Sequence, residues 1–362
     1  MKLSHLSETL IGSEIVKLGG EIRERIRQGE TIYNFTVGDF DPKIPLIYAL
    51  YRAICDKGDK VIYAVPSWNN NHYTHFVGGE HVIVEAHPED NFMPTADNLR
   101  PHLEGAVLLS LCSPQNPTGT TFRRDDLKAI CDLVVQENER RGAQEKKLYV
   151  LFDQMYWQLT YGDIEHYDPV SLHPGMRPYT IFVDAVSKVF AGTGVRVGWS
   201  MGPSVILNKM KAILSHVGAW APMAEQKAVA KFLVQFDAIE RFLAHFKKEL
   251  EERLRRIYEG LILLRSEGLP VDAVAPEAAI YLTIKIDAVG RTTADGTFLQ
   301  DQSAVTSYIL KEAKLAVVPF YAFGAPRNTP WYRLSVGTCH KEEIDEMLGK
   351  LRAALRGLRA AG

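Results

Sequence analysis

The chain has 362 residues, of which 46% are hydrophobic and 24% are charged, the balance expected of a globular protein in water. This length allows one large domain with a smaller one, or two domains of ordinary size. The net charge of -2 gives no electrostatic reason to expect nucleic acid or an anionic membrane surface as a partner. No stretch approaches the roughly 18 apolar residues that a membrane-spanning helix needs.

Cysteine usage and the N-terminus predict a cytoplasmic protein. The four cysteines, Cys55, Cys112, Cys131 and Cys339, are far apart and form no CxxC pair. This spacing favours free thiols in a reducing compartment and offers no framework for a metal. The first 26 residues have no long apolar core, so we expect no secretory signal.

Helices and strands are predicted to alternate along the first half of the chain. Helices are expected at 14–28, 45–58 and 124–140, and strands at 59–65, 80–86, 106–114, 147–156 and 179–187. Apolar strands separated by helices are typical of a parallel sheet that is covered on both faces. The sequence therefore predicts an α/β domain.

The second half of the chain has a different pattern. A nearly continuous helical pattern runs from 221 to about 268, and a mixed stretch follows at 279–287. A helix at 303–314, a strand at 315–320 and a helix at 341–355 complete the chain. We expect a long helix near Glu240 to link a large domain, residues 40–235, to a small α+β domain made of residues 1–39 and 236–362.

An indole, an amide, a carboxylate and an amine stand at the ends of four predicted strands, where ligand sites of open α/β sheets lie, and the amine is Lys188, after the strand 179–187. Trp68 comes just after the strand 59–65, and Asn116 lies in the loop "SPQNPTG" after the strand 106–114. Asp153 stands near the end of the apolar stretch "YVLFDQMYW". Each residue alone has an ordinary interpretation, such as a turn, a cap or a core aromatic. Their joint occurrence in this order favours a functional site.

A lysine and an arginine stand in the run of small and apolar residues from Val183 to Pro203. Lys188 follows Ser187, and Arg196 comes eight positions later between two glycines. A surface lysine needs no such surroundings. A lysine that must reach a bulky planar ligand does.

The combined motifs resemble the class I/II aminotransferases, fold type I enzymes that use pyridoxal 5'-phosphate (PLP). The matching pieces are "NFTVGDFD", "VPSWNNN", "SPQNPTGT", "LFDQMYW", "SKVFAGTGVRVGW" and "WYRLSVG", which extend from about residue 34 to residue 337. The resemblance implies a central, mostly parallel sheet of the seven-stranded type, flanked by helices, with a small α+β domain beside it.

The resemblance also implies a role for each matching residue of the PLP site. Lys188 would form the Schiff base with the cofactor aldehyde and then move the proton between substrate Cα and cofactor C4'. Asp153 would pair with the pyridinium nitrogen. Tyr156 and Asn116 would hydrogen-bond the phenolic oxygen of the ring. Trp68 would stack on the ring, while Ser187 and Arg196 would hold the phosphate.

Two further residues would bind the substrate if the resemblance holds. Arg333, in "WYRLSVG", matches the arginine that clamps the α-carboxylate, and Gly38 matches a glycine whose backbone meets the same group. Asn116 belongs to both sets. The relatives are homodimers that pass an amino group from an L-amino acid to a 2-oxo acid, commonly 2-oxoglutarate, by a ping-pong mechanism.

Two departures from the family pattern concern the phosphate. Ala185 stands where the family usually has Gly or Ser, which removes one hydroxyl. Between Lys43 and Ile44 the chain lacks some tens of residues that relatives carry, including a tyrosine and the small-residue turn that cradles the phosphate. Either the segment is deleted or the sequence omits it. The intact flanks favour omission, together with a structure that lacks cofactor or is partly disordered.

The choice of substrate stays open at this stage. Dicarboxylate-specific relatives use a second arginine near the stretch that matches "GAWAPMAEQ", and no arginine stands there. Trp220 and Met223 suggest either an apolar pocket or core packing, and Arg327 is interpreted as an exposed loop residue. A PLP-dependent lyase (a C–S lyase or one like the cyclopropane-forming lyases) and a non-catalytic homologue that binds a ligand remain as alternatives, because fold does not fix function.

Overall fold

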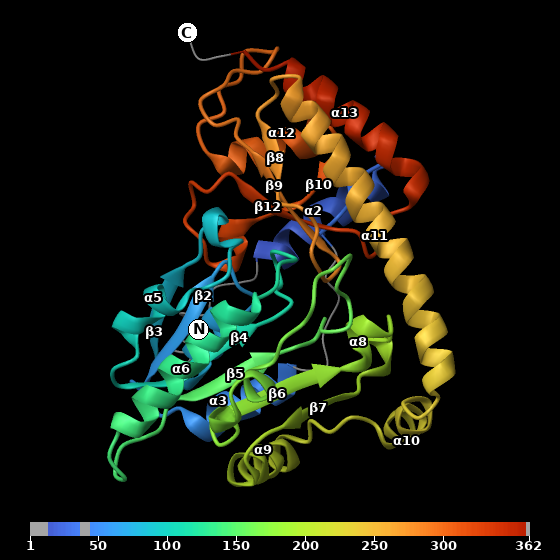
Figure 1. The fold of residues 1–362 in the computed structure, drawn as a ribbon. Helices are drawn as coiled ribbons and strands as arrows, with labels where there is room; N and C mark the ends of the chain where they lie inside the picture. The colour runs from blue at the N-terminus through green and yellow to red at the C-terminus, as the bar shows by residue number, and fades with distance from the viewer. Residues whose placement is uncertain (1–13, 37–43, 360–362) are drawn as a thin grey trace, which may run out of the picture. The chain divides into compact units, whose positions relative to one another are not determined.

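The computed structural model describes residues 14–36 and 44–359, and Figure 1 shows the course of the chain. The chain divides into two compact units. Among the described residues the first unit comprises 44–116 and 120–245, and the second comprises 14–36, 117–119 and 246–359. The predicted helix near Glu240 is α11 (Phe236–Ser266), which begins in the first unit and ends in the second. The sequence analysis placed the boundary between two domains at residue 235. The division into compact units does not test that boundary, so it stays a prediction.

The first unit is built on a sheet with the strand order β3-β2-β4-β5-β6-β7. Its strands are β2 (Lys60–Val65), β3 (Glu80–Glu85), β4 (Ala106–Cys112), β5 (Tyr149–Asp153), β6 (Thr180–Ala185) and β7 (Gly198–Met201). All neighbours pair in parallel except β7, which runs antiparallel to β6. The mostly parallel α/β sheet that the sequence predicts is confirmed.

The sheet has six strands among the described residues, where the resemblance implied the seven-stranded type. In this part of the chain β7 is an edge strand that pairs only with β6. The chain passes directly from Lys43 to Ile44 without the longer segment that the family comparison led us to expect. The first unit therefore has less chain from which to build another edge strand.

Helices cover both faces of this sheet, and Figure 1 shows α6 and α3 with the strands between them. The helices are α3 (Ile44–Ile54), α4 (Asn70–Val77), α5 (Ala96–Leu99), α6 (Arg124–Arg140), α7 (Pro169–Leu172), α8 (Val186–Val189), α9 (Ser204–Val217) and α10 (Met223–Phe232). Short 3-10 turns lie at η1 (Pro88–Asp90), η2 (Arg100–His102), η3 (Pro174–Met176) and η4 (Thr193–Val195).

The core of the first unit has two parts because successive strand residues point to opposite faces. On β2, Val61 packs in the cluster of α3 and α9, whereas Ile62 packs in the cluster of α6. On α6, Leu127, Ile130 and Val134 are buried at the spacing of one helix face. This two-sided burial explains why the strands read as apolar runs.

One predicted helix ends earlier than expected. The helix predicted at 45–58 is α3, which ends at Ile54. Residues 55–58 form a turn in which the Asp59 carboxylate accepts the Asp56 N–H at 2.7 Å, and Gly58 adopts a positive φ of 87°. A local aspartate bond and a left-handed glycine stop the helix before the sequence pattern does.

The second unit holds the predicted α+β part. Its four-stranded antiparallel sheet has the order β11-β12-β9-β8, and a separate parallel pair joins β1 to β10. The strands are β1 (Tyr33–Asn34), β8 (Val271–Ala273), β9 (Tyr281–Ile286), β10 (Leu315–Ala316), β11 (Val318–Pro319) and β12 (Trp331–Ser335). The helical elements are α2 (Glu14–Arg27), α12 (Gln302–Glu312), η5 (Phe320–Phe323), η6 (Lys341–Glu343) and α13 (Ile344–Arg356).

The prediction of one continuous strand at 315–320 is wrong. This stretch is split into β10 and β11, which pair with different partners on either side of Val317. An apolar run with no internal turn signal cannot reveal such a change of partner, because both short strands are fully buried.

Candidate active site

The carboxyl ends of β2, β4, β5 and β6 carry the residues that the sequence singled out in the first unit. These strands are neighbours in the sheet and run parallel, so their ends lie at one edge. Neighbouring strands are about 4.8 Å apart, so four of them span roughly 14 Å. That width suits a phosphorylated aromatic cofactor. The set is Trp68, Asn116, Asp153, Tyr156, Ser187 and Lys188.

The loops that carry Trp68 and Asn116 are tied together by a hydrogen bond. Asn116 is buried, and its neighbour Gln115 donates from Nε2 to the carbonyl oxygen of Pro66 at 2.7 Å. Gln115 also donates its backbone N–H to Thr120 O at 2.8 Å, which closes the loop after β4. The two loops therefore act as one piece of backbone in the first unit.

Asp153 ends β5, and its carboxylate is only 8% exposed. Its Oδ1 accepts the backbone N–H of Met155 at 3.2 Å, and Ser113 donates its N–H to the Asp153 carbonyl at 3.0 Å. Tyr156 follows in the next turn and is fully buried at 1% exposure. A buried carboxylate and a buried phenol thus enter the site from one short segment.

Lys188 lies in α8, the single turn that continues directly from β6. Its side chain is buried, 7% exposed, and so is its neighbour Ser187. Arg196 ends η4 in the left-handed region with φ 61°, a conformation that costs a non-glycine residue about 1 kcal/mol. Its guanidinium Nη1 donates to Thr193 O at 3.2 Å. The structure thus gives a buried amine in α8 and a conformationally constrained arginine at the end of η4, and their joint role at a cofactor stays a prediction.

The described residues fit PLP at the ring and at one side of its phosphate. The hydroxyl of Ser187 is buried and has no hydrogen-bond partner among the residues that the structure describes. Such an unsatisfied buried hydroxyl costs about 1–3 kcal/mol unless a ligand supplies a partner. A phosphate oxygen held by Ser187 and Arg196 would supply it.

The other side of the phosphate has fewer candidates. The first turn of α3 contains Ile44 and Pro45, and a proline has no N–H to offer an anion. Residues 37–43, which precede it, lie outside the described residues. The first turn of α3, which begins at Ile44, therefore offers a phosphate fewer N–H donors than a turn without proline would.

The two predicted substrate residues belong to the second unit. Gly38 lies outside the described residues. Arg333 is on β12 and only 1% exposed, with Nη2 donating to Thr36 O at 2.9 Å. Its guanidinium carbon lies 4.6 Å from the ring centroid of Tyr281 and 4.9 Å from that of Phe323. Two aromatic faces therefore fix the plane of the guanidinium.

Sequence reasoning missed Asn70, a buried polar residue two positions after Trp68. Asn70, at the start of α4, accepts hydrogen bonds from Ser110 Oγ at 2.9 Å and from Tyr51 Oη at 3.2 Å. It also donates to Ser67 Oγ at 3.1 Å. These partners come from α3, β4 and the Trp68 turn. The only available signal was three consecutive asparagines after a tryptophan, which is an ordinary loop pattern.

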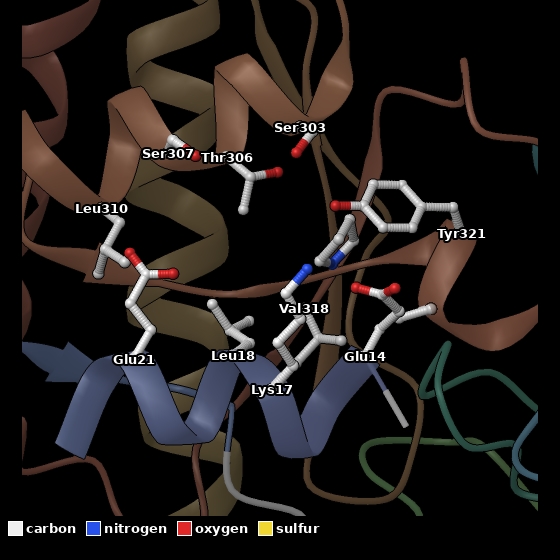
Figure 2. A pocket seen from close by; sticks show the side chains of 12 residues that line it. Glu14, Lys17, Leu18, Glu21, Ser303, Thr306, Ser307, Leu310, Val318 and Tyr321 are labelled. Atoms are coloured by element: carbon white, nitrogen blue, oxygen red, sulfur yellow. The ribbon is translucent and has the colours of Figure 1, made fainter. Parts of the chain in front are cut away.

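A separate cavity lies within the second unit, between α2 and α12 (Figure 2). Lys17 and Glu14 from α2 face Ser303 and Thr306 from α12 and Tyr321 from η5. Its volume is about 90 Å³, whereas small-molecule sites usually measure about 300–1,000 Å³. This cavity is too small for PLP, so the sheet edge of the first unit remains the candidate active site.

Residues 14–36 and 44–359 contain neither a cluster of metal-ligating side chains nor a membrane-spanning helix. In this part of the chain no three His, Cys, Asp or Glu side chains are grouped so that they could hold a metal ion. None of the described helices is both long and apolar enough to cross a lipid bilayer.

Comparison with known proteins gives consistent results. Residues 44–351 match the family described as "Aminotransferase class I and II". The aspartate aminotransferase of Bacillus sp. (strain YM-2) is 29% identical over 285 residues, covering 78% of this chain and 67% of that protein. That of Streptomyces avermitilis is 30% identical over 283 residues, covering 77% of this chain and 65% of that protein.

Solved structures are similar over almost the whole chain. The aspartate aminotransferase from Rhizobium meliloti superimposes with a TM-score of 0.87 at 22% identity, covering 99% of this chain and 100% of that chain. The aromatic aminotransferase from Pyrococcus horikoshii OT3 gives a TM-score of 0.75 at 27% identity, covering 96% and 88%. The first likeness concerns the fold alone.

The family match covers residues 44–351, which is most of the chain. The chain belongs to the class I and II aminotransferases, transferases that depend on pyridoxal 5'-phosphate and act on amino acids.

Proposed function

We propose that this enzyme moves an amino group from an L-amino acid to a 2-oxo acid, with 2-oxoglutarate as acceptor, in two alternating half-reactions. The observation that supports the proposal is that an amide, a carboxylate, a phenol and an amine stand at or just after the ends of β4, β5 and β6, three neighbouring parallel strands. These are Asn116, Asp153, Tyr156 and Lys188. An unrelated binding protein has no need to bury an amine and a carboxylate at one sheet edge.

The residues divide the work of holding the cofactor. Asp153 would hold a proton on the ring nitrogen, and Asn116 and Tyr156 would hydrogen-bond the ring oxygen. Trp68 would cover the ring face. Ser187 and Arg196 would bind the phosphate, with Arg196 giving a two-pronged contact. When bound, PLP supplies an electrophilic carbon and a ring that accepts electrons from the substrate.

Lys188 is the residue to which we assign proton transfer. Its amine, buried at the start of α8, would take the proton from substrate Cα and return it during product formation. Burial keeps water from competing for that proton.

L-Aspartate is the first donor to test. Most of the relatives compared above are aspartate aminotransferases, and Arg333 would bind the α-carboxylate. The aromatic faces of Tyr281 and Phe323 hold its guanidinium in one plane, which suits a fork-like contact with a carboxylate. The stretch from Gly218 to Gln226 offers no arginine for a second carboxylate, so aromatic and neutral donors belong in the same panel.

We also propose a cytoplasmic homodimer. Large apolar side chains are exposed between α9 and the start of α11, where core packing of Trp220 and Met223 had been one expectation. Trp220 is 49% exposed and Met223 is 64% exposed, so neither is core. Val217, Val234 and Phe236 are exposed on the same stretch. Exposed apolar residues at this density favour a partner surface, and the four thiols suit a reducing compartment.

The first experiment is absorbance after addition of PLP, followed by a panel of amino acids. Wild type should gain an absorbance band that Lys188→Ala does not gain, while Lys209→Ala, an exposed lysine on α9, should behave as wild type. With a donor but no acceptor, wild type should release about one 2-oxo acid per site and then stop. Added 2-oxoglutarate should restart the release.

Two results would contradict the proposal. Continuous product release without an acceptor would indicate a lyase. The absence of an absorbance band in wild type would indicate a homologue that does not carry out the reaction, as the missing phosphate turn would allow.

A further inference from the structure

Asp184 is a second buried carboxyl group at the same sheet edge, and the roles assigned above do not use it. It lies on β6, four residues before Lys188, and is only 4% exposed. In the register of β5 and β6, Asp153 pairs with Val183, and Val183 directly precedes Asp184. A buried carboxylate is costly unless it is paired or hydrogen-bonded. Its presence in an apolar strand therefore calls for a reason.

The hydrogen bonds of Asp184 connect two catalytic segments. Its Oδ2 accepts the indole N–H of Trp157 at 3.0 Å, and its Oδ1 accepts the N–H of Ala185 at 2.7 Å. Trp157 directly follows Tyr156, and its backbone N–H donates to Gln154 O at 3.0 Å to close the turn. The segment that presents Asp153 and Tyr156 is therefore fastened to the strand that presents Lys188.

The choice of aspartate at this position is informative. The two oxygens accept from two different N–H donors, and asparagine has only one acceptor oxygen. An asparagine would turn its own N–H₂ toward one of these donors. Asparagine therefore cannot reproduce the arrangement, and an apolar residue would leave the indole N–H unsatisfied, since the edge is buried.

We propose that Asp184 is a positioning residue that holds the turn from Gln154 to Trp157 against β6 and so sets Asp153 and Tyr156 relative to Lys188. Asp184 itself touches neither substrate nor cofactor. The proposal rests on the proposed function for its catalytic consequence, but the bond between Asp184 and Trp157 can be tested in the PLP-free protein.

Ionisation of Asp184 should alter this bond, because protonation removes the charge that the indole N–H faces. The titratable groups around the pair are Asp153 from β5, Tyr156 from the turn, His166 from the following loop and Lys188 further along the chain. The ring of His166 lies 6.3 Å from that of Trp157. On the other side, β7 places Trp199 opposite Asp184 and contributes no charge. Burial raises the pKa of Asp184 to about 7 and lowers the pKa of His166 to about 4, so the two titrations are separable.

The test begins with tryptophan emission of the PLP-free chain as a function of pH. Subtracting the signal of Trp157→Phe from that of wild type isolates Trp157 among the five tryptophans. We expect a transition near neutral pH that Asp184→Asn loses. Asp163→Asn, which removes an exposed carboxylate from the neighbouring loop, should keep it. A Trp157 emission that is the same in wild type and Asp184→Asn at every pH would overturn the proposal.

The second arm uses the PLP-loaded enzyme. Asp184→Asn and Trp157→Phe should each lower kcat by about tenfold to a hundredfold and leave KM for the amino donor nearly unchanged. The double variant should be no worse than either single one, because both remove the same bond. If kcat is unchanged while the emission transition is lost, Asp184 does not position the catalytic groups and the proposal fails. If wild type transfers no amino group, the proposed function fails. The pH dependence of tryptophan emission in the PLP-free chain still tests the bond between Asp184 and Trp157.

Discussion

Gln115 Nε2 donates to Pro66 O at 2.7 Å, and this bond joins the loop of Asn116 to the turn of Trp68. Gln115 is 3% exposed, so water cannot easily replace the bond. Asn116 would contact the ring oxygen of the cofactor, and Trp68 would contact its ring face. The bond from Gln115 therefore positions these two residues together.

Replacing Gln115 should test this coupling. Gln115→Leu keeps most of the volume but leaves the Pro66 carbonyl without its donor, at a cost of about 1–3 kcal/mol of folding free energy. We expect PLP to bind several-fold more weakly and Trp68 emission to be quenched less by the cofactor. Fluorescence titration with PLP measures both effects. Equal affinity and equal quenching in the variant would contradict the coupling.

Ser187→Ala should weaken PLP binding by roughly tenfold, because a hydrogen bond to a charged phosphate contributes about 1.5 kcal/mol or more. The variant loses no hydrogen bond to any described residue, so its unfolding free energy without PLP should not fall. Ser200→Ala is a matched control. Its hydroxyl is also buried without a partner among the described residues, but it lies on β7. Unchanged PLP affinity in Ser187→Ala would argue against its contact with phosphate.

Arg333→Lys should raise KM for every amino donor by about tenfold to a hundredfold, since a lysine cannot give a bidentate contact. The effect should not depend on the side chain of the donor, because the α-carboxylate is common to all of them. Arg327→Lys is the control, because Arg327 is exposed and lies over the Tyr321 ring at 5.5 Å. A change limited to one donor would assign Arg333 to side-chain recognition instead.

Stability should depend on pH through Asp184. Its pKa is raised to about 7 by burial in the folded chain, whereas an unfolded aspartate releases its proton near pH 4. Between these values the folded state binds more protons than the unfolded one, so the stability from this group is full below about pH 4 and is lost as the pH rises to about 7. The shift corresponds to roughly 4 kcal/mol at most.

Urea unfolding of the PLP-free chain at pH 5 and pH 8 measures this effect. The advantage of wild type over Asp184→Asn should shrink at pH 8, while the difference between wild type and Asp163→Asn should not change. The buried His166 also titrates, but it is present in every variant and cancels in the comparison. An advantage that is equal at both pH values would show that Asp184 does not titrate in this range.

Measuring the intact mass of the purified protein tests whether it contains a further segment between Lys43 and Ile44. A chain of the printed sequence has a mass of 40.6 kDa. A larger intact mass would support the hypothesis that the sequence omits a segment. A mass equal to 40.6 kDa would mean that the segment is deleted, and PLP would then depend more heavily on Ser187 and Arg196 for its phosphate.

The sequence predicted several elements with a clear period, but it missed α9 (Ser204–Val217), a helix of 14 residues, and it failed where contacts are distant. The helix at 124–140 matches α6 at both ends, because charged residues begin it and an apolar stripe runs through it. The four-residue β7 and the turn α8 went unrecognised as elements, since neither is long enough to show a period. The strand ends gave the candidate residues, because a parallel sheet gathers its carboxyl ends at one edge.

The supporting residues of the site could not be predicted in the same way. Asn70 and Ser110 are 40 positions apart, and Trp157 and Asp184 are 27 apart. Such pairs depend on strand order and register, which a single sequence does not give. Asp184 did leave one signal, a charged residue inside an apolar strand, but aspartates in strands have many ordinary explanations.

Residues 117–119 belong to the second unit although the chain on both sides of them belongs to the first. Within that unit Thr283 Oγ1 donates to Thr118 O at 2.8 Å, and Ala278 donates its N–H to Gly119 O at 2.9 Å. Dividing the chain after residue 245 would therefore give two fragments, neither of which contains all the residues of one compact unit. Anyone who wishes to exchange the second unit between relatives must transplant this tripeptide as well, so the natural unit of recombination in this fold is discontinuous.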